Sequence, residues 1–145
     1  MTVFLTILAG VATFALGQFV LVLLVEPVRE LKRTIADIAV ALIKYANIYS
    51  NPGVVGDEKE NEAARELRAL ASKLNAQMYL VPAYSKLYRL FGLPAKSSIS
   101  QSMRYLIGIS NAMHKGNADM GTANAEKSDK VCDLLGIHMP DQDRA

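Results

Sequence analysis

The sequence predicts an all-α protein, in which a single N-terminal transmembrane helix is followed by a small cytoplasmic bundle of about four to five helices. Three observations predict this fold class. Residues 2–25 carry no ionisable side chain. After Pro27, apolar residues recur at spacings of three and four, as on one face of an α-helix. Turns containing Gly or Pro divide the remaining chain into helix-length segments, and no alternating strand pattern occurs.

The first segment, residues 2–25, has the length and composition of a membrane span. As a helix, its 24 residues would measure about 36 Å, against a hydrocarbon core of roughly 30 Å. A buried helix of a soluble domain is one other interpretation, and the length of the uncharged run argues against it. A cleavable signal peptide is another, but it would begin with basic residues and have a shorter apolar run. We therefore expect an uncleaved anchor.

Basic residues directly after this segment predict its orientation. Arg29, Lys32 and Arg33 follow the span, whereas no basic side chain precedes it. Cytoplasmic flanks of membrane spans carry an excess of Lys and Arg. We expect a single-pass protein of the plasma (inner) membrane, with its N-terminus outside and its C-terminal domain in the cytoplasm.

Small residues recur along the span in a pattern that is typical of helix packing in membranes. Thr6, Gly10, Thr13 and Gly17 are spaced by three or four residues, so they share one face of the helix. Small side chains allow a second helix to approach closely, and Gln18 could hydrogen-bond across such a contact. The expected occupant of this face is another membrane protein or a second copy of the chain.

The first cytoplasmic helix is expected to run to about Ile48, after a kink or restart at Pro27. Its apolar stripe predicts which side chains are buried. The stripe consists of Val28, Leu31, Ile35, Ile38, Leu42, Tyr45 and Tyr49. Alanine and isoleucine occupy flanking positions where a two-stranded coiled coil would carry charges. The wide apolar face therefore favours a bundle.

Turn and capping signals place the later helices. A Ser-Asn-Pro-Gly turn at residues 50–53 is followed by Asp57, which we expect to cap a helix that Pro82 interrupts. The predicted buried face of that helix is Ala63, Leu67, Leu70, Ala71, Leu74 and Met78. A short helix is expected over residues 83–90.

Two further helices complete the predicted bundle, which spans residues 26–138. Residues 98–101 read Ser-Ile-Ser-Gln, which is a capping box that predicts a helix start at Ser98. The last helix is expected over residues 122–135, with Gly136 in the left-handed cap position and Ile137 as its apolar companion. Residues 139–145 form a polar tail.

The sequence carries no constellation that indicates catalysis, a metal site or a bound cofactor. His114 and His138 lie 24 residues apart with no partner at ligand spacing. Cys132 is the only cysteine, and its surroundings predict a small buried hydrophobic residue. The serines after Lys96 are better explained as helix caps than as nucleophiles. We therefore expect a protein that is not an enzyme.

Charge is distributed unevenly along the domain. No acid occurs over residues 67–118, whereas the last 27 residues hold six acids and three bases. The candidate surface in the acid-free run comprises Tyr84, Lys86, Tyr88, Arg89, Lys96, Arg104 and Lys115. Interleaved aromatic and basic residues are typical of segments at a membrane surface. Three interpretations remain open, namely contact with the lipid bilayer, contact with a protein partner, and pairing with the chain's own acidic flank.

The expected function is that of a membrane-anchored, non-enzymatic accessory or adaptor protein whose helical domain contacts a partner protein or the membrane surface. A membrane-anchored enzyme whose site is assembled only by folding is the first alternative. A nucleic-acid binder is a weaker alternative, because the net charge is only +2 and no reading motif is present.

Overall fold

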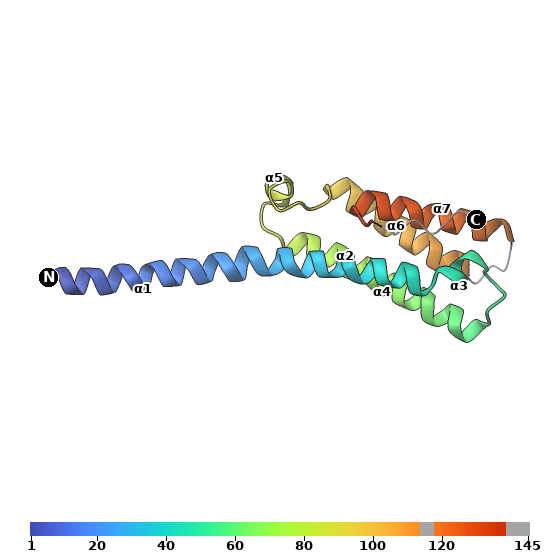
Figure 1. Ribbon diagram of the computed structural model, residues 1–145, viewed down its shortest axis with the longest axis horizontal. Helices are drawn as coiled ribbons and strands as arrows, with labels where there is room; N and C mark the ends of the chain where they lie inside the picture. Colours follow the sequence, from blue (N-terminus) through green and yellow to red (C-terminus); the bar gives the residue numbers. More distant parts are fainter. Residues whose placement is uncertain (114–117, 139–145) are drawn as a thin grey trace.

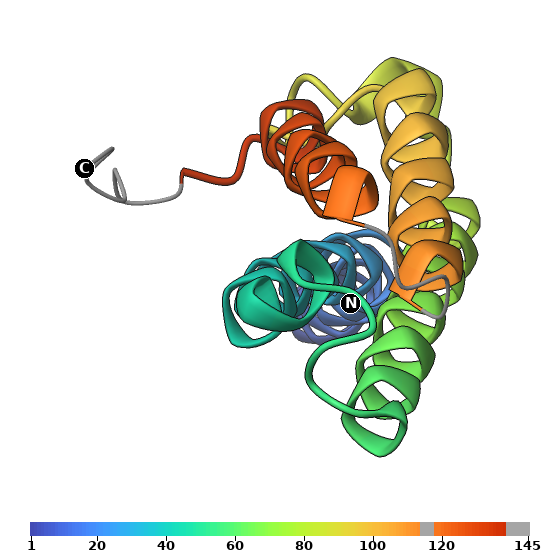
Figure 2. The ribbon, with the colours of Figure 1, turned by 90° about the vertical axis from the view of Figure 1, so that its right-hand side faces the viewer.

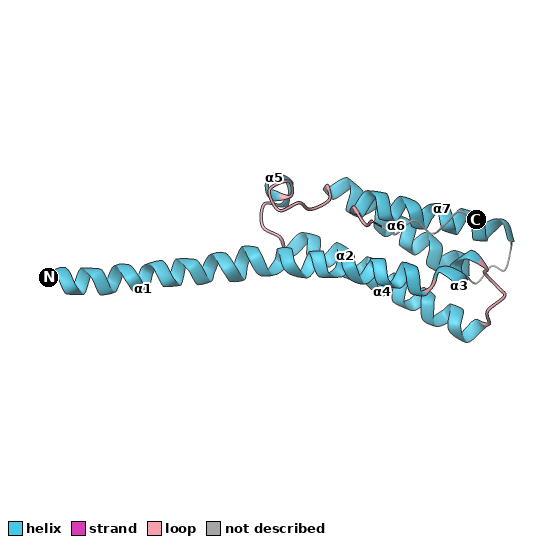
Figure 3. Ribbon diagram, in the orientation of Figure 1, coloured by secondary structure: helices cyan, strands magenta, loops and turns pink. Residues whose placement is uncertain are grey.

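The computed structural model describes residues 1–113 and 118–138. Within these ranges the chain forms helices and connecting turns, without a strand (Figure 3). A long N-terminal helix projects from one end of a bundle of antiparallel helices (Figure 1). This arrangement confirms the predicted all-α fold class with an N-terminal candidate span. The expected polar tail, 139–145, lies outside the described residues.

The candidate span and the first helix of the bundle are one continuous helix. α1 (Thr2–Val20), a π-helical turn (Leu21–Val25) and α2 (Glu26–Lys44) follow one another without a break. Together they form a 43-residue helix whose N-terminal part is long and apolar enough to cross a membrane. None of the residues of α1 is buried in the bundle, so α1 is not a core helix of the domain.

Of the expected kink or restart at Pro27, the restart is not observed, because one helix runs from Thr2 to Lys44. Proline has no N–H to bond with the carbonyl four residues earlier, and its ring clashes with that carbonyl. In the preceding π-helical turn the Glu26 N–H bonds to the carbonyl of Leu21, five residues earlier. This wider turn lies directly before Pro27 and includes Leu23, the residue four positions earlier. The helix thereby continues through the proline.

Within the described residues, the long helices of the bundle are α2, α4, α6 and α7. They are arranged around one core (Figure 2). α4 (Asp57–Leu80) packs against α2, α6 (Lys96–Ala112) against α4, and α7 (Ala118–Leu135) against α6. The predicted α2 stripe is buried, with Ile35 partly so. In α4 the predicted face is also buried, except that Leu70 is partly exposed.

A short helix after α2 attaches that side of the bundle to α7. α2 ends at Lys44, one turn earlier than expected, and α3 (Ala46–Ser50) begins after Tyr45. The Tyr49 hydroxyl and Ser128 Oγ are 3.0 Å apart, and the Asn124 side-chain amide donates to the Tyr49 carbonyl at 3.1 Å. These polar groups are buried and paired, so they fix α3 against α7.

Three helix starts differ from their predicted positions. α4 begins at Asp57, and Gly56 occupies the cap position that was expected for Asp57. The buried Glu60 carboxylate, in the first turn of α4, accepts the Gly53 N–H at 2.8 Å. α6 begins at Lys96 with no side-chain cap, so the predicted capping box at Ser98 is wrong. α7 begins four residues before the predicted start. Pro94 lies just before the cap residue Ala95, outside α6, so it removes no hydrogen bond from that helix.

The C-terminal end of α7 is formed as predicted. Gly136 has φ +68°, the left-handed conformation that glycine adopts at low cost. The Ile137 N–H bonds to the Cys132 carbonyl at 2.9 Å, and Ile137 packs on the core. This is the Schellman arrangement expected from the sequence.

Candidate functional site at the end of the bundle next to the candidate span

The segment between α4 and α6 forms a compact platform, which we call the α5 shelf (residues 81–95). Val81, the residue before Pro82, ends α4 in an extended conformation, which residues before a proline prefer. Ala83 has φ +48°, so the chain turns sharply here and α4 does not continue through Pro82. α5 (Tyr84–Leu87) follows and is shorter than the helix predicted over residues 83–90. Gly92, at φ +60°, ends the turn.

The shelf is attached firmly to the bundle. The side chains of Val81, Tyr84 and Leu93 are buried in the core. The Tyr84 hydroxyl donates to the Pro94 carbonyl at 2.6 Å, and the Leu93 N–H bonds to the Tyr88 carbonyl at 2.7 Å. Burial raises the pKa of Tyr84 to about 12, which keeps this hydroxyl protonated as a donor near neutral pH.

Two basic side chains of the shelf region contact aromatic rings. The rings of Tyr84 and Tyr88 are stacked, with centroids 6.3 Å apart. Arg89 Nε donates to the Tyr88 hydroxyl at 3.0 Å, and its guanidinium lies 5.6 Å from the centre of that ring. The Lys96 ammonium lies 5.1 Å from the centre of the Tyr79 ring. Cation–π contacts of this kind orient a charge without neutralising it.

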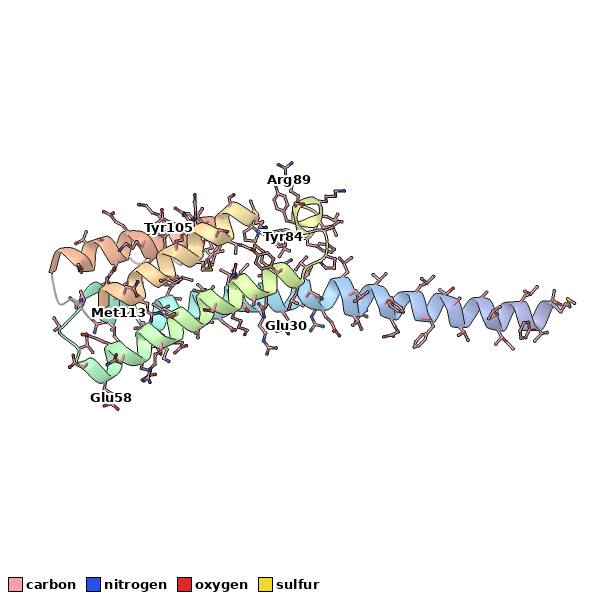
Figure 4. The ribbon with its side chains drawn as sticks, turned by 180° about the vertical axis from the view of Figure 1, so that it is seen from behind. Glu30, Glu58, Tyr84, Arg89, Tyr105 and Met113 are labelled. Atoms are coloured by element: carbon pink, nitrogen blue, oxygen red, sulfur yellow. The ribbon has the colours of Figure 1, made fainter. Side chains whose placement is uncertain are left out.

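The shelf lies beside the point where the candidate span enters the bundle (Figure 1). In Figure 4, Tyr84 and Arg89 lie at the same level along the long axis as Glu30, in the first turns of α2. The exposed Arg29, Lys32 and Arg33 belong to the same part of α2. Basic residues that are far apart in the sequence therefore lie at the same level along the long axis, at one end of the domain.

The structure divides the predicted basic surface. Lys86, Arg89 and Lys96 lie on the shelf or directly after it, and all three are exposed. Arg104 is exposed on α6, more than two turns beyond Lys96. Lys115 lies outside the described residues. The basic surface is therefore concentrated at the shelf rather than spread evenly over two helices.

Among the described side chains, no ion pair joins these bases to an acid of α7. The ion pairs within 4 Å are those of Lys44 with Glu62 and Glu66, and of Lys73 with Asp37. All of them link α2 to α4. In the described part of α7, Lys127 contacts Asn124 and Lys130 lies over the Tyr105 ring.

The predicted packing face of the span lies on a helix that the bundle leaves open. The hydroxyls of Thr6 and Thr13 donate to backbone carbonyls of their own helix, each at 2.9 Å. Gly10 and Gly17 have open space where a side chain would begin. Gln18 contributes to a shallow groove with Phe19, Val22 and Leu23 at the π-helical turn.

Within residues 1–113 and 118–138, no three His, Cys, Asp or Glu side chains are grouped as metal ligands would be. Burial raises the pKa of the Cys132 thiol to about 11, and the nearby Asp129 and Asp133 act in the same direction. The thiol is therefore a buried apolar group rather than a nucleophile, as its surroundings in the sequence predict.

Among the described residues, a tight cluster of titratable groups outside the shelf links α2 to α4. The Tyr45 hydroxyl bonds to Glu66, and Lys44 contacts both of them. Desolvation and the Glu66 carboxylate raise the pKa of Tyr45, so Tyr45 stays a neutral donor. The hydrogen bond from Tyr45, followed by Lys44, lowers the pKa of Glu66. The cluster acts as a structural link between two helices.

Sequence reasoning did not find the exposed apolar residues beside the shelf. Tyr79, Leu80 and Leu90 expose about two thirds or more of their surface. Tyr79 and Leu80 lie in the last turn of α4 and Leu90 follows α5, and hydrophobicity along the chain does not reveal that these side chains are exposed. No protein-family model, curated protein or solved structure matches the chain.

Proposed function

We propose that this chain is a single-pass, membrane-anchored accessory or adaptor protein of the plasma (inner) membrane, whose cytoplasmic bundle contacts a partner membrane protein. The observation that carries the proposal is the continuous helix from Thr2 to Lys44. Its N-terminal half is apolar on every side and unburied, so it needs a lipid environment. Its C-terminal half is a core helix of the bundle.

A continuous helix positions the bundle more strictly than a flexible linker would. A Gly/Ser linker leaves a domain free to sample many orientations, whereas an α-helix is rigid over several turns. The bundle is therefore held at a fixed distance and angle to the span. This rigidity suits a protein that must meet a neighbour in the same membrane in one defined geometry.

The outer face of α2 offers a surface on which such a neighbour could pack. Val40 and Ile43 are exposed there, and Ala36 lies one turn before Val40 on the same face. These residues are opposite the buried stripe of α2. Because they continue from the span along the same helix, a partner helix leaving the membrane beside α1 could contact both segments.

Topology is the first prediction that follows. A reporter fused after the last residue is expected to be active as a cytoplasmic fluorescent protein and inactive as alkaline phosphatase. The reason is that Arg29, Lys32 and Arg33 retain their flank in the cytoplasm. Replacing these three residues by Gln is the matched control, and it should weaken this preference. Phosphatase activity of the unchanged chain would contradict the proposed orientation.

Partner contact is tested by purifying the full chain from its native membrane in mild detergent. We expect a second protein at constant stoichiometry, or a defined homo-oligomer by light scattering. Introducing a charge with Val40→Glu and Ile43→Glu should reduce that association at least about tenfold, because a charge buried at an apolar contact is costly. Val54→Glu introduces the same charge in the loop before α4, where Val54 is exposed, and should leave the association intact.

A chain that purifies as a monomer without a constant companion would contradict the adaptor proposal. Retention of the companion by the α2 double variant would show that the contact lies elsewhere on the chain. Thermal unfolding of each variant checks that the bundle is intact, since exposed substitutions usually change stability by less than about 0.5 kcal/mol.

A further inference from the structure

Three exposed apolar side chains lie on the α5 shelf or directly before it. Tyr79 and Leu80 end α4, and Leu90 follows α5 with 76% of its surface exposed. Contiguous exposed apolar groups are typical of interaction surfaces, and these three residues lie in neighbouring segments at the same end of the domain. This end is the one from which the candidate span leaves the bundle (Figure 1).

The charges at the shelf indicate the chemical class of molecule that can bind there. Lys86 and Arg89 lie on the shelf, Lys96 begins α6, and no acid occurs over residues 67–118. Arg89 uses one N–H on the Tyr88 hydroxyl, and a guanidinium has five donors in all. Its remaining donors suit a phosphate. An occupant with both anionic phosphate and hydrocarbon therefore fits this surface.

The position of the shelf indicates which molecule this occupant is. Residue 25 ends the uncharged segment, and Figure 4 places Tyr84 and Arg89 level with Glu30, a few residues further along the same helix. Glu30 is five residues beyond residue 25, so at about 1.5 Å per residue this level lies about 7 to 8 Å past the end of the span. A bilayer changes from hydrocarbon to headgroups over that depth. Tyrosine, leucine and basic side chains are enriched there.

We propose that the α5 shelf rests on the membrane that the N-terminal helix crosses, with Leu80 and Leu90 at the edge of the hydrocarbon and Lys86 and Arg89 on anionic phospholipid headgroups. The proposal rests on the anchoring proposed above and adds the ligand class to it. The shelf forms a second contact with the membrane beside the span, so the same side of the bundle always faces the bilayer.

The test measures how closely three positions approach the lipid in the purified full-length chain. A bimane fluorophore is attached at Leu90→Cys, at Val20→Cys in the span, or at Val54→Cys before α4. Val54 is 78% exposed, much like Leu90, and belongs to the turn between α3 and α4. That turn lies at the end of the bundle away from the N-terminal helix (Figure 1). The native Cys132 is buried with a raised pKa of about 11, so unmodified protein provides the labelling blank.

Each labelled protein is reconstituted in vesicles of mixed phosphatidylglycerol and phosphatidylcholine that carry brominated acyl chains as quenchers. We expect quenching at Val20→Cys and Leu90→Cys, and none at Val54→Cys. Val54 follows α3, beyond Lys44 at the far end of α2, which is about 28 Å past the end of the span. In phosphatidylcholine alone, quenching at Leu90→Cys should fall while quenching at Val20→Cys stays constant.

Charge reversal identifies the lipid contact. Each base near an anionic surface contributes about 1 kcal/mol, which is about a fivefold effect. Lys86→Glu with Arg89→Glu, in the Leu90→Cys background, should lower the ratio of docked to undocked shelf by about 25-fold or more. Arg104→Glu alters an exposed base on α6, farther from the shelf, and should leave the ratio nearly unchanged.

The outcomes separate the two proposals. Quenching at Val20→Cys without quenching at Leu90→Cys would overturn the shelf contact and leave the anchor standing, whereas absence of both would overturn both. Equal quenching after the charge reversal would overturn the role of anionic lipid. A lower unfolding midpoint of the reversed variant, with quenching unchanged, would show that these bases pair within the protein, and it would also overturn the inference.

Discussion

Replacing Ile38 or Leu42 by alanine is expected to lower the free energy of unfolding of the bundle by about 2–5 kcal/mol for each variant. Both side chains are fully buried in the core. Truncation loses their apolar burial and also leaves a cavity, because close-packed neighbours relax only in part. Urea denaturation of the fragment 28–145, followed by circular dichroism, measures the loss.

Ile43→Ala is the matched control, because it removes the same atoms from the same helix. Ile43 is 52% exposed, whereas Ile38 is 0% exposed. The control is expected to cost less than about 1 kcal/mol, since much of its side chain already faces solvent. Similar losses for Ile38→Ala and Ile43→Ala would contradict the observed direction of the α2 stripe. A loss below about 0.5 kcal/mol at Ile38 would mean that the stripe is a surface feature.

Substituting Gly121 by alanine is expected to destabilise the bundle by about 3 kcal/mol or more. Gly121 lies on α7 where that helix crosses the end of α3. A Cβ atom added there would overlap the backbone carbonyl oxygen of Ser50 and lie 3.0 Å from its carbonyl carbon. Backbone atoms cannot move aside as a flexible side chain can, so α3 and α7 would have to separate. The buried bonds of Tyr49 to Ser128 and Asn124 would weaken with them.

Gly108→Ala should have the opposite sign, and it controls for the general effect of removing a helical glycine. Gly108 lies inside α6, and an added Cβ would meet only the flexible Lys127 side chain, at 3.8 Å or more. Alanine is favoured over glycine in a helix interior by roughly 0.5–1 kcal/mol. Urea denaturation of both variants tests the contrast. A loss of stability at Gly108, or no loss at Gly121, would contradict the packing of α6 and α7 described above.

Local patterns in the sequence predicted most of the helices correctly. The spacing of Val28, Ile38 and Leu42 predicted the buried face of α2, because a helix of 3.6 residues per turn places these residues on one side. The same reasoning predicted the α4 face, and Gly136 predicted the end of α7. These features depend on neighbours within one or two turns, which a sequence displays directly.

The features that the sequence did not predict depend on contacts between distant segments. The serine at position 98 fits a capping pattern, yet α6 begins two residues earlier, after Pro94 and Ala95. The exposure of Leu90 depends on where the shelf docks on the bundle, which hydrophobicity along the chain does not reveal. Glu60 has a charged side chain of the kind that is normally exposed, but it is buried. Its carboxylate accepts a hydrogen bond from the Gly53 N–H in the preceding loop.

The π-helical turn before Pro27 also makes the junction tolerant of one specific change in length. Inserting a residue into an ordinary α-helix rotates everything beyond it by about 100°, so the bundle would face a different side of the span. The π-helical turn already contains one residue more per turn than an α-helical one. Deleting one residue from Leu21–Val25 would convert it to an α-helical turn and keep the rotational phase between span and bundle nearly unchanged. Deletions elsewhere between Val11 and Val20 would turn the bundle about the axis of the candidate span.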